Sequence, residues 1–152
     1  MAVKKIPDGF HTVTAHLTIA GCSDAIEFYK KAFGAEEQAR MPGPGGKIMH
    51  ATLRIGDSMV MCNDAFPEWG SPGPDGKCSP VKIALYVEDA DAMFKGATDA
   101  GAEVVMPMMD APWGDRYGMV RDQWGHEWEL CTHVEDLTPE QIGERMSKMG
   151  CG

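Results

Sequence analysis

The sequence lacks the features that would place the protein in a membrane or on a nucleic acid. No apolar run approaches the roughly 20 residues that span a bilayer, and residues 1–8 have no signal-peptide core. Basic residues are too few for a basic surface, because the chain has 14 Lys and Arg but 23 Asp and Glu, and its net charge is -9. A protein that binds a nucleic acid or an anionic membrane needs a basic surface. We therefore expect a soluble, cytoplasmic protein that has neither of these partners.

Paired cysteines are also missing. The five cysteines are odd in number and widely spaced, and no C-x-x-C pair occurs among them. This spacing argues against a disulfide framework and a zinc ribbon, and it favours reduced thiols in a cytosol. The five are Cys22, Cys62, Cys78, Cys131 and Cys151.

The common motifs of nucleophilic catalysis and of phosphate binding are missing as well. The glycine-rich stretch at residues 41–46 lacks the lysine and hydroxyl residue that end a phosphate loop. No G-x-S-x-G elbow and no Ser, His and Asp in a catalytic order occur. The sequence therefore gives no reason to propose a covalent nucleophile.

What the sequence does contain is an internal repeat with an offset of 67 residues, within a length of 152 that suits one domain. The matching positions are 24–25 with 91–92, 34–36 with 101–103, and 54 with 121. Two amphipathic helices of similar composition could explain the first two matches. One shared offset across about 30 residues favours a true duplication instead.

Each copy reads as a strand, a helix and three strands. Copy one, at about residues 11–63, has a helix that Ser23 or Asp24 could cap and that Gly34 ends. Its strands are predicted at 12–19, 36–41, 47–55 and 58–63. Copy two, at about 81–132, has a predicted helix at 89–100 and strands at 81–87, 102–108, 115–121 and 126–131.

Two segments lie outside the copies. Residues 64–80 are rich in proline and glycine, so they form a linker or a lid that carries Phe66 and Trp69 over a pocket. A capping box at Thr138 opens a C-terminal helix over residues 138–149. We expect the whole of residues 1–152 to be a single domain.

Four segments together resemble the glyoxalase/bleomycin resistance protein/extradiol dioxygenase superfamily, also called vicinal oxygen chelate, and within it the PhnB-like subgroup. They are AIEFYKKAFGAE at 25–36, IMHATLRIGD at 48–57, GDRYG at 114–118 and DQWGH at 122–126. The resemblance runs from about residue 11 to residue 136. It implies an α+β fold, in which two tandem βαβββ modules form a cupped eight-stranded mixed sheet, and a homodimer.

The resemblance also implies where a metal would bind. Enzymes of the superfamily typically hold one divalent metal with four side chains, two from each module. These positions fall on Thr14, on Cys62, on Val81 or Lys82, and on Glu129. Of these only Glu129 is a usual ligand, Cys62 offers a thiol, and a protonated lysine repels a cation. We therefore expect the usual metal site to be missing, and no cofactor.

A relocated metal site is the alternative. His16 and His50 point into the same cavity as Glu129 if the modules form a cup, and two histidines with one carboxylate suit Zn, Ni, Mn or Fe. The protein would then be a metal-dependent lyase, isomerase or dioxygenase, with Glu129 as its candidate catalytic residue.

The favoured function is the binding of a small amphiphilic or aromatic molecule in the cup of the sheet, as in the bleomycin resistance proteins. Trp113 offers an aromatic wall, and Arg116 either grips an anionic group of the ligand or pairs with Asp115 to fix the turn. The candidate pocket residues are His16, His50, Cys62, Trp113, Arg116, Tyr117 and Glu129.

Overall fold

The structure, a computed structural model, describes residues 2–150 and divides the chain into two compact units. Unit 1 runs to Cys78 and also takes in Gln123–Gly125, and unit 2 takes Ser79–Asp122 and the residues from His126 onward. None of the helices in the described part of the chain is long and apolar enough to cross a membrane. Cys22, Cys62, Cys78 and Cys131 are free thiols, and Cys151 lies outside the described residues.

Unit 1 contains one βαβββ module. Its strands form a mixed sheet in the order β1-β4-β3-β2, in which β1 and β4 are parallel and the other neighbours are antiparallel. The elements are β1 (Ala15–Ile19), α1 (Cys22–Phe33), β2 (Glu36–Pro42), η1 (Pro44–Gly46), β3 (Ile48–Ile55), β4 (Ser58–Asp64) and η2 (Pro67–Trp69).

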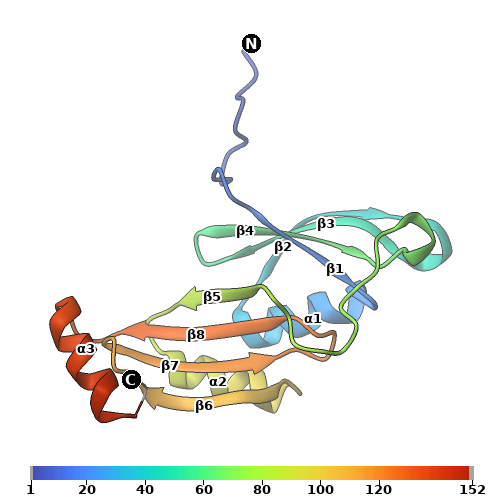
Figure 1. The fold of residues 1–152 in the computed structure, drawn as a ribbon. Helices are drawn as coiled ribbons and strands as arrows, with labels where there is room; N and C mark the ends of the chain where they lie inside the picture. The colour runs from blue at the N-terminus through green and yellow to red at the C-terminus, as the bar shows by residue number, and fades with distance from the viewer. Residues whose placement is uncertain (1, 151–152) are drawn as a thin grey trace. The chain divides into compact units, whose positions relative to one another are not determined.

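Unit 2 repeats the same topology. Its sheet has the order β5-β8-β7-β6, with β5 and β8 parallel, and Figure 1 shows α2 along one face of this sheet and α3 beyond the end of β8. The elements are β5 (Lys82–Tyr86), α2 (Ala90–Asp99), β6 (Glu103–Asp110), β7 (Asp115–Arg121), β8 (Glu127–His133) and α3 (Pro139–Lys148).

The predicted α+β fold of two βαβββ modules is therefore confirmed, with the eight strands divided between two four-stranded mixed sheets. The segment at 64–80, predicted to be irregular, contains the short helix η2, and the ring of Phe66 stacks on that of Trp69 at 4.5 Å. The capping box at Thr138 is present at the start of α3.

The helices α1 and α2 each pack an apolar stripe on one face of their own sheet. In unit 1 the inner face of α1 is buried, and Tyr29 on this face has no exposed surface. In unit 2 Gly118 leaves room for α2, because a Cβ atom there would lie 3.1 Å from the ring of Phe94. Trp128 and Leu130 are fully buried. We call the face that the helix does not cover the open face of each sheet.

The start of α1 corrects the sequence prediction. The helix begins at Cys22 after Gly21, and neither Ser23 nor Asp24 caps it. Instead, the carboxylate of Asp64, at the end of β4, accepts hydrogen bonds from the backbone N–H groups of Gly21 and Cys22 at 3.2 and 3.0 Å. A side chain about 40 residues away thus satisfies the donors that a local cap would otherwise take.

Candidate functional site

The open face of unit 1 carries the two histidines of the candidate pocket. His16 in β1 and His50 in β3 lie side by side, with ring centroids 5.6 Å apart and rings nearly perpendicular. His50 Nε2 also lies 3.2 Å from the hydroxyl oxygen of Thr52. The structure thus brings these two predicted residues together within one unit.

Cys62 lies on the opposite side of the same sheet. It has no exposed surface and contacts the thiol of Cys22 in α1. The contact with Cys62, together with burial, raises the pKa of Cys22 far above its ordinary value. Cys62 is therefore a core residue of unit 1 rather than a residue of an open pocket, which corrects its place in the candidate pocket.

The prediction for Cys62 fails because the two copies differ by one residue in the turn before their last strand. Ala51 in β3 lies opposite Cys62 in β4, and Gly118 in β7 lies opposite Leu130 in β8. Ala51 and Gly118 are 67 residues apart (118 less 51), but Cys62 and Leu130 are 68 apart (130 less 62). Since strand side chains alternate between faces, one extra residue in the second copy's turn exchanges the faces of all that follows.

By the observed register, the residue of unit 1 that is equivalent to Glu129 is consequently Met61 and not Cys62. Cys62 corresponds to Leu130, and both are fully buried on the helix side. Glu129 lies on the open face of unit 2. The constant offset of 67 that the sequence suggested holds for the paired strands β3 and β7 but fails for β4 and β8.

Unit 2 gathers most of the remaining candidates around Asp115, which is 3% exposed. One oxygen of its carboxylate accepts hydrogen bonds from the hydroxyl of Tyr86 at 2.8 Å and from Nε1 of Trp113 at 3.0 Å. The other oxygen lies 2.8 Å from Nδ1 of His133, whose Nε2 lies 2.9 Å from Asp136. Asp115 therefore connects strands β5, β7 and β8 with the loop that carries Trp113.

These contacts shift three pKa values. Burial alone raises the pKa of Asp115, but the hydrogen bonds from its neighbours outweigh burial and hold it below its ordinary value. The bond to Asp115, with burial, raises the pKa of Tyr86 to about 12. The hydrogen bonds to Asp136 and then to Asp115 raise the pKa of His133. At neutral pH Asp115 is thus an ionised carboxylate that holds neutral hydroxyl and indole donors.

Next to Asp115, a row of large side chains crosses the open face of unit 2. Its members are Cα partners in the register of neighbouring strands: Tyr86, Cys131, Tyr117 and Met109. The ring of Trp113 lies 5.3 Å from that of Tyr117 in an edge-to-face arrangement. We call the rings of Tyr86, Trp113 and Tyr117 the aromatic cradle.

Glu129 lies in the neighbouring row, between Ala84 in β5 and Met119 in β7. Its carboxylate accepts a hydrogen bond from the hydroxyl of Tyr117 at 3.0 Å. Burial and this bond raise the pKa of Tyr117, and burial raises the pKa of Cys131 to about 11. The phenol is therefore a stable donor, and the thiol is a poor nucleophile at neutral pH.

Arg116 does not belong to this face. Its guanidinium binds Asp91 in α2, with Nε and one terminal nitrogen 3.0 and 2.9 Å from the carboxylate, and reaches Asp110 at 3.3 Å. Arg116 therefore joins β7 to α2 on the helix side. The predicted pair with Asp115 is wrong, because Asp115 lies on the opposite face. The predicted grip on an anionic ligand remains a prediction.

A cavity of about 550 Å³ lies in unit 2 beside Asp115, and none of the three cradle rings lines it. Asp115 lines this cavity, together with Ala111 and Pro112 of the loop before β7, Val134 after β8, and Met149 at the end of α3. This volume is in the range of small-molecule sites.

The residues at the four family positions do not fit a metal. Among the four positions that the family resemblance implied, Cys62 is turned into the core and Lys82 Nζ lies 3.5 Å from Glu127. Within the described residues, no group of three or more His, Cys, Asp and Glu side chains could hold a metal ion. The alternative set takes His16 and His50 from unit 1 and Glu129 from unit 2, and it remains a prediction.

The comparison with known families assigns the chain to a superfamily. The family model described as Glyoxalase/Bleomycin resistance protein/Dioxygenase superfamily matches residues 10–130. The chain belongs to this superfamily. Among its relatives, the Mycobacterium bovis protein Mb0911c is 43% identical over 145 residues, which cover 92% of this chain and 95% of the relative.

Solved structures of the superfamily share the fold. TioX from Micromonospora is 32% identical, with a TM-score of 0.65 over 82% of this chain and 99% of TioX. TnmS3, an antibiotic binding protein from Streptomyces, is 22% identical, with a TM-score of 0.61 over 88% of this chain and 99% of TnmS3. A PhnB protein from Bacillus cereus is 17% identical, with a TM-score of 0.58 over 80% of this chain and 99% of PhnB.

Two residues were not predicted from the sequence, namely Tyr86 of the cradle and Asp115 as the acceptor that holds its rings. For Tyr86 a signal exists in the turns, since two residues separate the paired Ile55 and Ser58 and three separate Asp122 and His126, but only the observed pairing shows where each turn begins. The role of Asp115 had no such signal.

Proposed function

We propose that this member of the superfamily binds a small molecule with a flat apolar or aromatic body at the aromatic cradle of unit 2. The observation that carries the proposal is the arrangement around Asp115. A buried carboxylate holds the polar atoms of Tyr86 and Trp113, while their side chains remain exposed, with residue exposures of 65% and 37%.

This arrangement favours ligand binding because the rings are held in place before a ligand arrives. Exposed aromatic rings provide large contact areas, and rings that are already fixed lose little conformational freedom on binding. The row of Cys131, Tyr117 and Met109 provides an apolar floor, and Asp115, which holds two of the rings, also lines a separate cavity.

The superfamily includes both enzymes and binding proteins, so the fold alone does not decide the function. TnmS3 is an antibiotic binding protein, but its likeness to this chain extends to the fold only. Our proposal depends on the residues of this chain. The donor set at the family positions does not fit a metal, so a metal-dependent lyase, isomerase or dioxygenase would need the relocated set of His16, His50 and Glu129.

A neutral fluorescent probe, N-phenylnaphthylamine, tests the proposal by titration of the protein. Trp113→Ala removes one wall of the cradle, and we expect it to weaken binding by about tenfold, in line with the loss of a buried aromatic contact. Trp69→Ala is the matched control, because Trp69 is 60% exposed and lies in η2 of unit 1. Equal losses in both variants, or no binding by the wild type, would contradict the proposal.

The homodimer expected from the family resemblance remains a prediction. Sedimentation equilibrium of the purified chain measures it directly, and a monomer at micromolar concentration would overturn it.

A further inference from the structure

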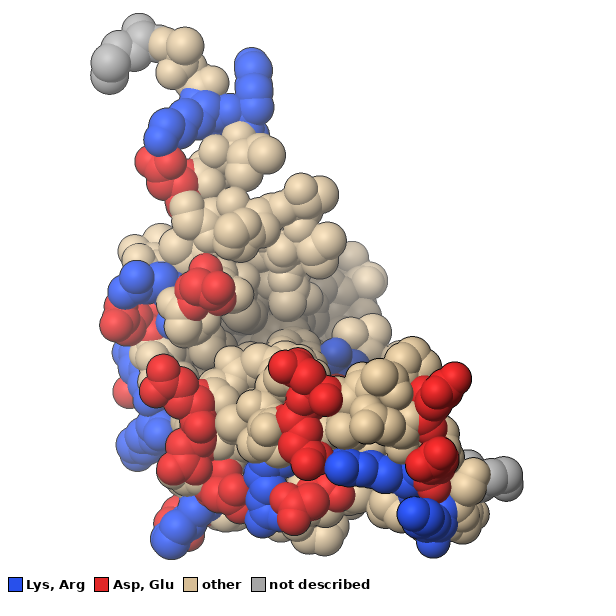
Figure 2. Space-filling view, turned by 90° about the vertical axis from the view of Figure 1, so that its left-hand side faces the viewer, with Lys and Arg blue, Asp and Glu red and all other residues tan. Residues whose placement is uncertain are grey.

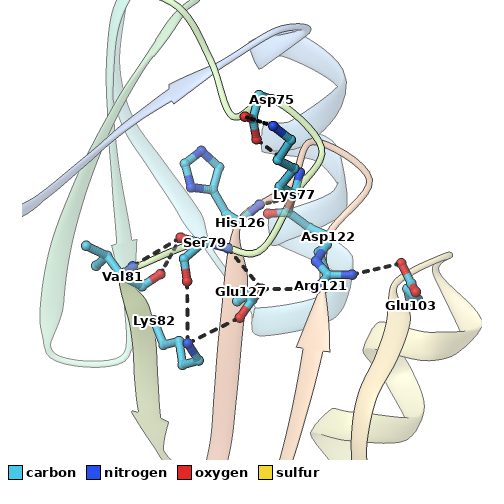
Figure 3. A network of polar contacts seen from close by, with 10 residues as sticks. All are labelled: Asp75, Lys77, Ser79, Val81, Lys82, Glu103, Arg121, Asp122, His126 and Glu127. Atoms are coloured by element: carbon cyan, nitrogen blue, oxygen red, sulfur yellow. Dashed lines mark hydrogen bonds and ion pairs between the residues drawn. The ribbon is translucent and has the colours of Figure 1, made fainter.

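On the open face of unit 2, one row of side chains at an end of the strands is charged. The first row consists of Lys82, Glu127, Arg121 and Glu103, which are Cα partners across four strands. Lys82 and Arg121 both reach the buried carboxylate of Glu127, at 3.5 and 3.1 Å, and Arg121 also reaches Glu103 at 3.3 Å. Two positive and two negative charges thus compensate one another in this row, as Figure 3 shows.

Glu127 is also bonded by the backbone N–H of Ser79 at 3.1 Å. Burial raises the pKa of Glu127, but this bond and its two cationic partners hold the pKa below its ordinary value. Such pairing is common on this protein. On the face drawn in Figure 2, acidic and basic side chains are interspersed rather than gathered by sign.

Glu129, two residues further along β8, is different. Within the described residues its carboxylate has a single hydrogen-bond partner, the neutral hydroxyl of Tyr117, and no ion-pair partner. Its neighbours in the register are Ala84 and Met119, neither of which carries charge. A partly buried carboxylate among apolar side chains is costly unless a cation or further donors approach it.

The surroundings of Glu129 leave space for such a group. Ala84 is the smallest side chain of its row, and it is exposed. On the other side, Tyr117 joins Glu129 directly to the cradle, because the same ring contacts Trp113 at 5.3 Å. A ligand whose body lies on Trp113, beside the buried ring of Tyr117, would therefore bring a substituent close to the carboxylate.

We propose that Glu129 gives this site a preference for ligands that carry a positive charge on an aromatic or apolar body, an inference that rests on the binding function proposed above. A cation here gains the attraction of the carboxylate and of the ring faces of the cradle at once. An anion is repelled by Glu129 and by the chain as a whole, which has a net charge of -9.

A matched pair of ligands isolates the charge. Naphthylmethyl-trimethylammonium and neopentylnaphthalene have the same shape, because a carbon atom replaces the quaternary nitrogen in the second. The quaternary ammonium has no N–H group, so its advantage reports charge rather than hydrogen bonding. In calorimetric titrations of the full chain we expect the cation to bind about tenfold more tightly than its neutral isostere.

Glu129→Gln tests the residue. The amide oxygen can still accept the hydrogen bond from Tyr117, so the variant should keep the wild-type melting temperature. We expect it to remove the tenfold advantage of the cation while the neutral ligand binds as before. Glu68→Gln is the control, because it removes the same charge from an exposed residue of unit 1 and should leave the advantage intact.

Salt is an independent measurement that needs no variant. Added NaCl should weaken the binding of the cation more than that of its isostere, because it screens the carboxylate. Equal affinities for the two ligands in the wild type, or an advantage that persists in Glu129→Gln, would overturn the inference and leave the binding function standing. Failure of both ligands to bind would instead count against the binding function itself.

Discussion

The two open faces of this protein have the same strand order but different chemistry. An ion pair between an arginine and a glutamate is common to both faces, since Arg54 pairs with Glu36 in unit 1 and Arg121 pairs with Glu103 in unit 2. Beyond that pair the faces diverge. Where unit 2 has Ala84, Glu129, Met119 and Met106 in one row, unit 1 has His16, Met61, Thr52 and Ala39.

The next row differs in the same way. Tyr86, Cys131 and Tyr117 of unit 2 correspond to Thr18, Asn63 and His50 of unit 1. The helix sides, by contrast, keep apolar residues in both units, because each must pack on a helix. Duplication therefore preserved what the core needs and left the open faces free to acquire separate roles.

The first N–H groups of α1 and α2 are bound by side chains at equivalent positions of β4 and β8, but these side chains differ. Asp64 in β4 receives the N–H groups of Gly21 and Cys22 and, through its second oxygen, that of Ile48 at 2.6 Å. Its counterpart in β8, Thr132, receives only the N–H of Ala90 at 2.9 Å. At the start of α2 the N-cap residue Asp89 also accepts a hydrogen bond, from the N–H of Ala92.

The largest expected effect compares these anchors. Asp64→Ala leaves three backbone donors unpaired, of which those of Cys22 and Ile48 are buried, so we expect a loss of about 3 kcal/mol in the free energy of unfolding. Thr132→Ala should cost about 1 kcal/mol, because Asp89 still caps α2. Urea denaturation measures both. Equal losses in the two variants would show that the helices are not anchored differently.

A smaller effect is expected at the centre of the cradle. Asp115→Ala removes the shared acceptor of Tyr86, Trp113 and His133, all of which can turn to water, so we expect a loss of about 2 kcal/mol. It should also weaken the binding of the neutral probe, because the rings lose their support. The control is Asp110→Ala, whose side chain is 89% exposed and which should cost less than about 0.5 kcal/mol.

If Asp115→Ala lowers stability but leaves probe affinity unchanged, the carboxylate supports the sheet and does not position the rings. A second variant, Asp115→Asn, keeps an acceptor oxygen for Tyr86 and Trp113, and it should restore much of the affinity.

The smallest effect depends on pH. The folded pKa of His133 lies above its unfolded value of about 6.5, so its contribution is fully present below about pH 6.5 and is lost as pH rises through the folded pKa. The folded pKa of Asp115 is lowered, so its contribution is present throughout this range and is lost only in strong acid. Between about pH 5.5 and about pH 8.5, His133 alone of the two therefore changes.

We expect His133→Gln to lower the urea midpoint more at about pH 5.5 than at about pH 8.5. His11→Gln is the control, because His11 is exposed near the N-terminus and should show no such difference. A deficit in His133→Gln that is the same at both pH values would mean that the ion pairs with Asp115 and Asp136 add nothing beyond a neutral hydrogen bond.

Most of the fold could be predicted from local signals. The period-2 strands, the amphipathic helices and the repeated residues placed every strand and α-helix within a few positions of its observed bounds, while the short helices η1 and η2 were not predicted. The start of α1 could not be predicted, because its cap comes from Asp64 in another strand. Local residues such as Ser23 and Asp24 offered a plausible cap that the tertiary contact displaces.

The candidate site was predictable only in part. Trp113, Tyr117 and Glu129 were predicted as pocket residues, and the structure brings them together in unit 2. Cys62 and Arg116 were predicted with them, but both point to the helix side of their sheets. For Cys62 the error follows from assuming one constant offset between the copies.

By itself the sequence determined the order of elements, the duplication and the apolar stripe of each helix that packs on a sheet. These features depend on residues close together in the chain. Only the tertiary structure decided which face each residue of the last strands occupies and which groups Asp64 and Asp115 bind. Strand side chains alternate with a period of two, so one residue added in a turn reverses every face after it. Hydrogen bonds between distant strands leave no pattern in the local sequence.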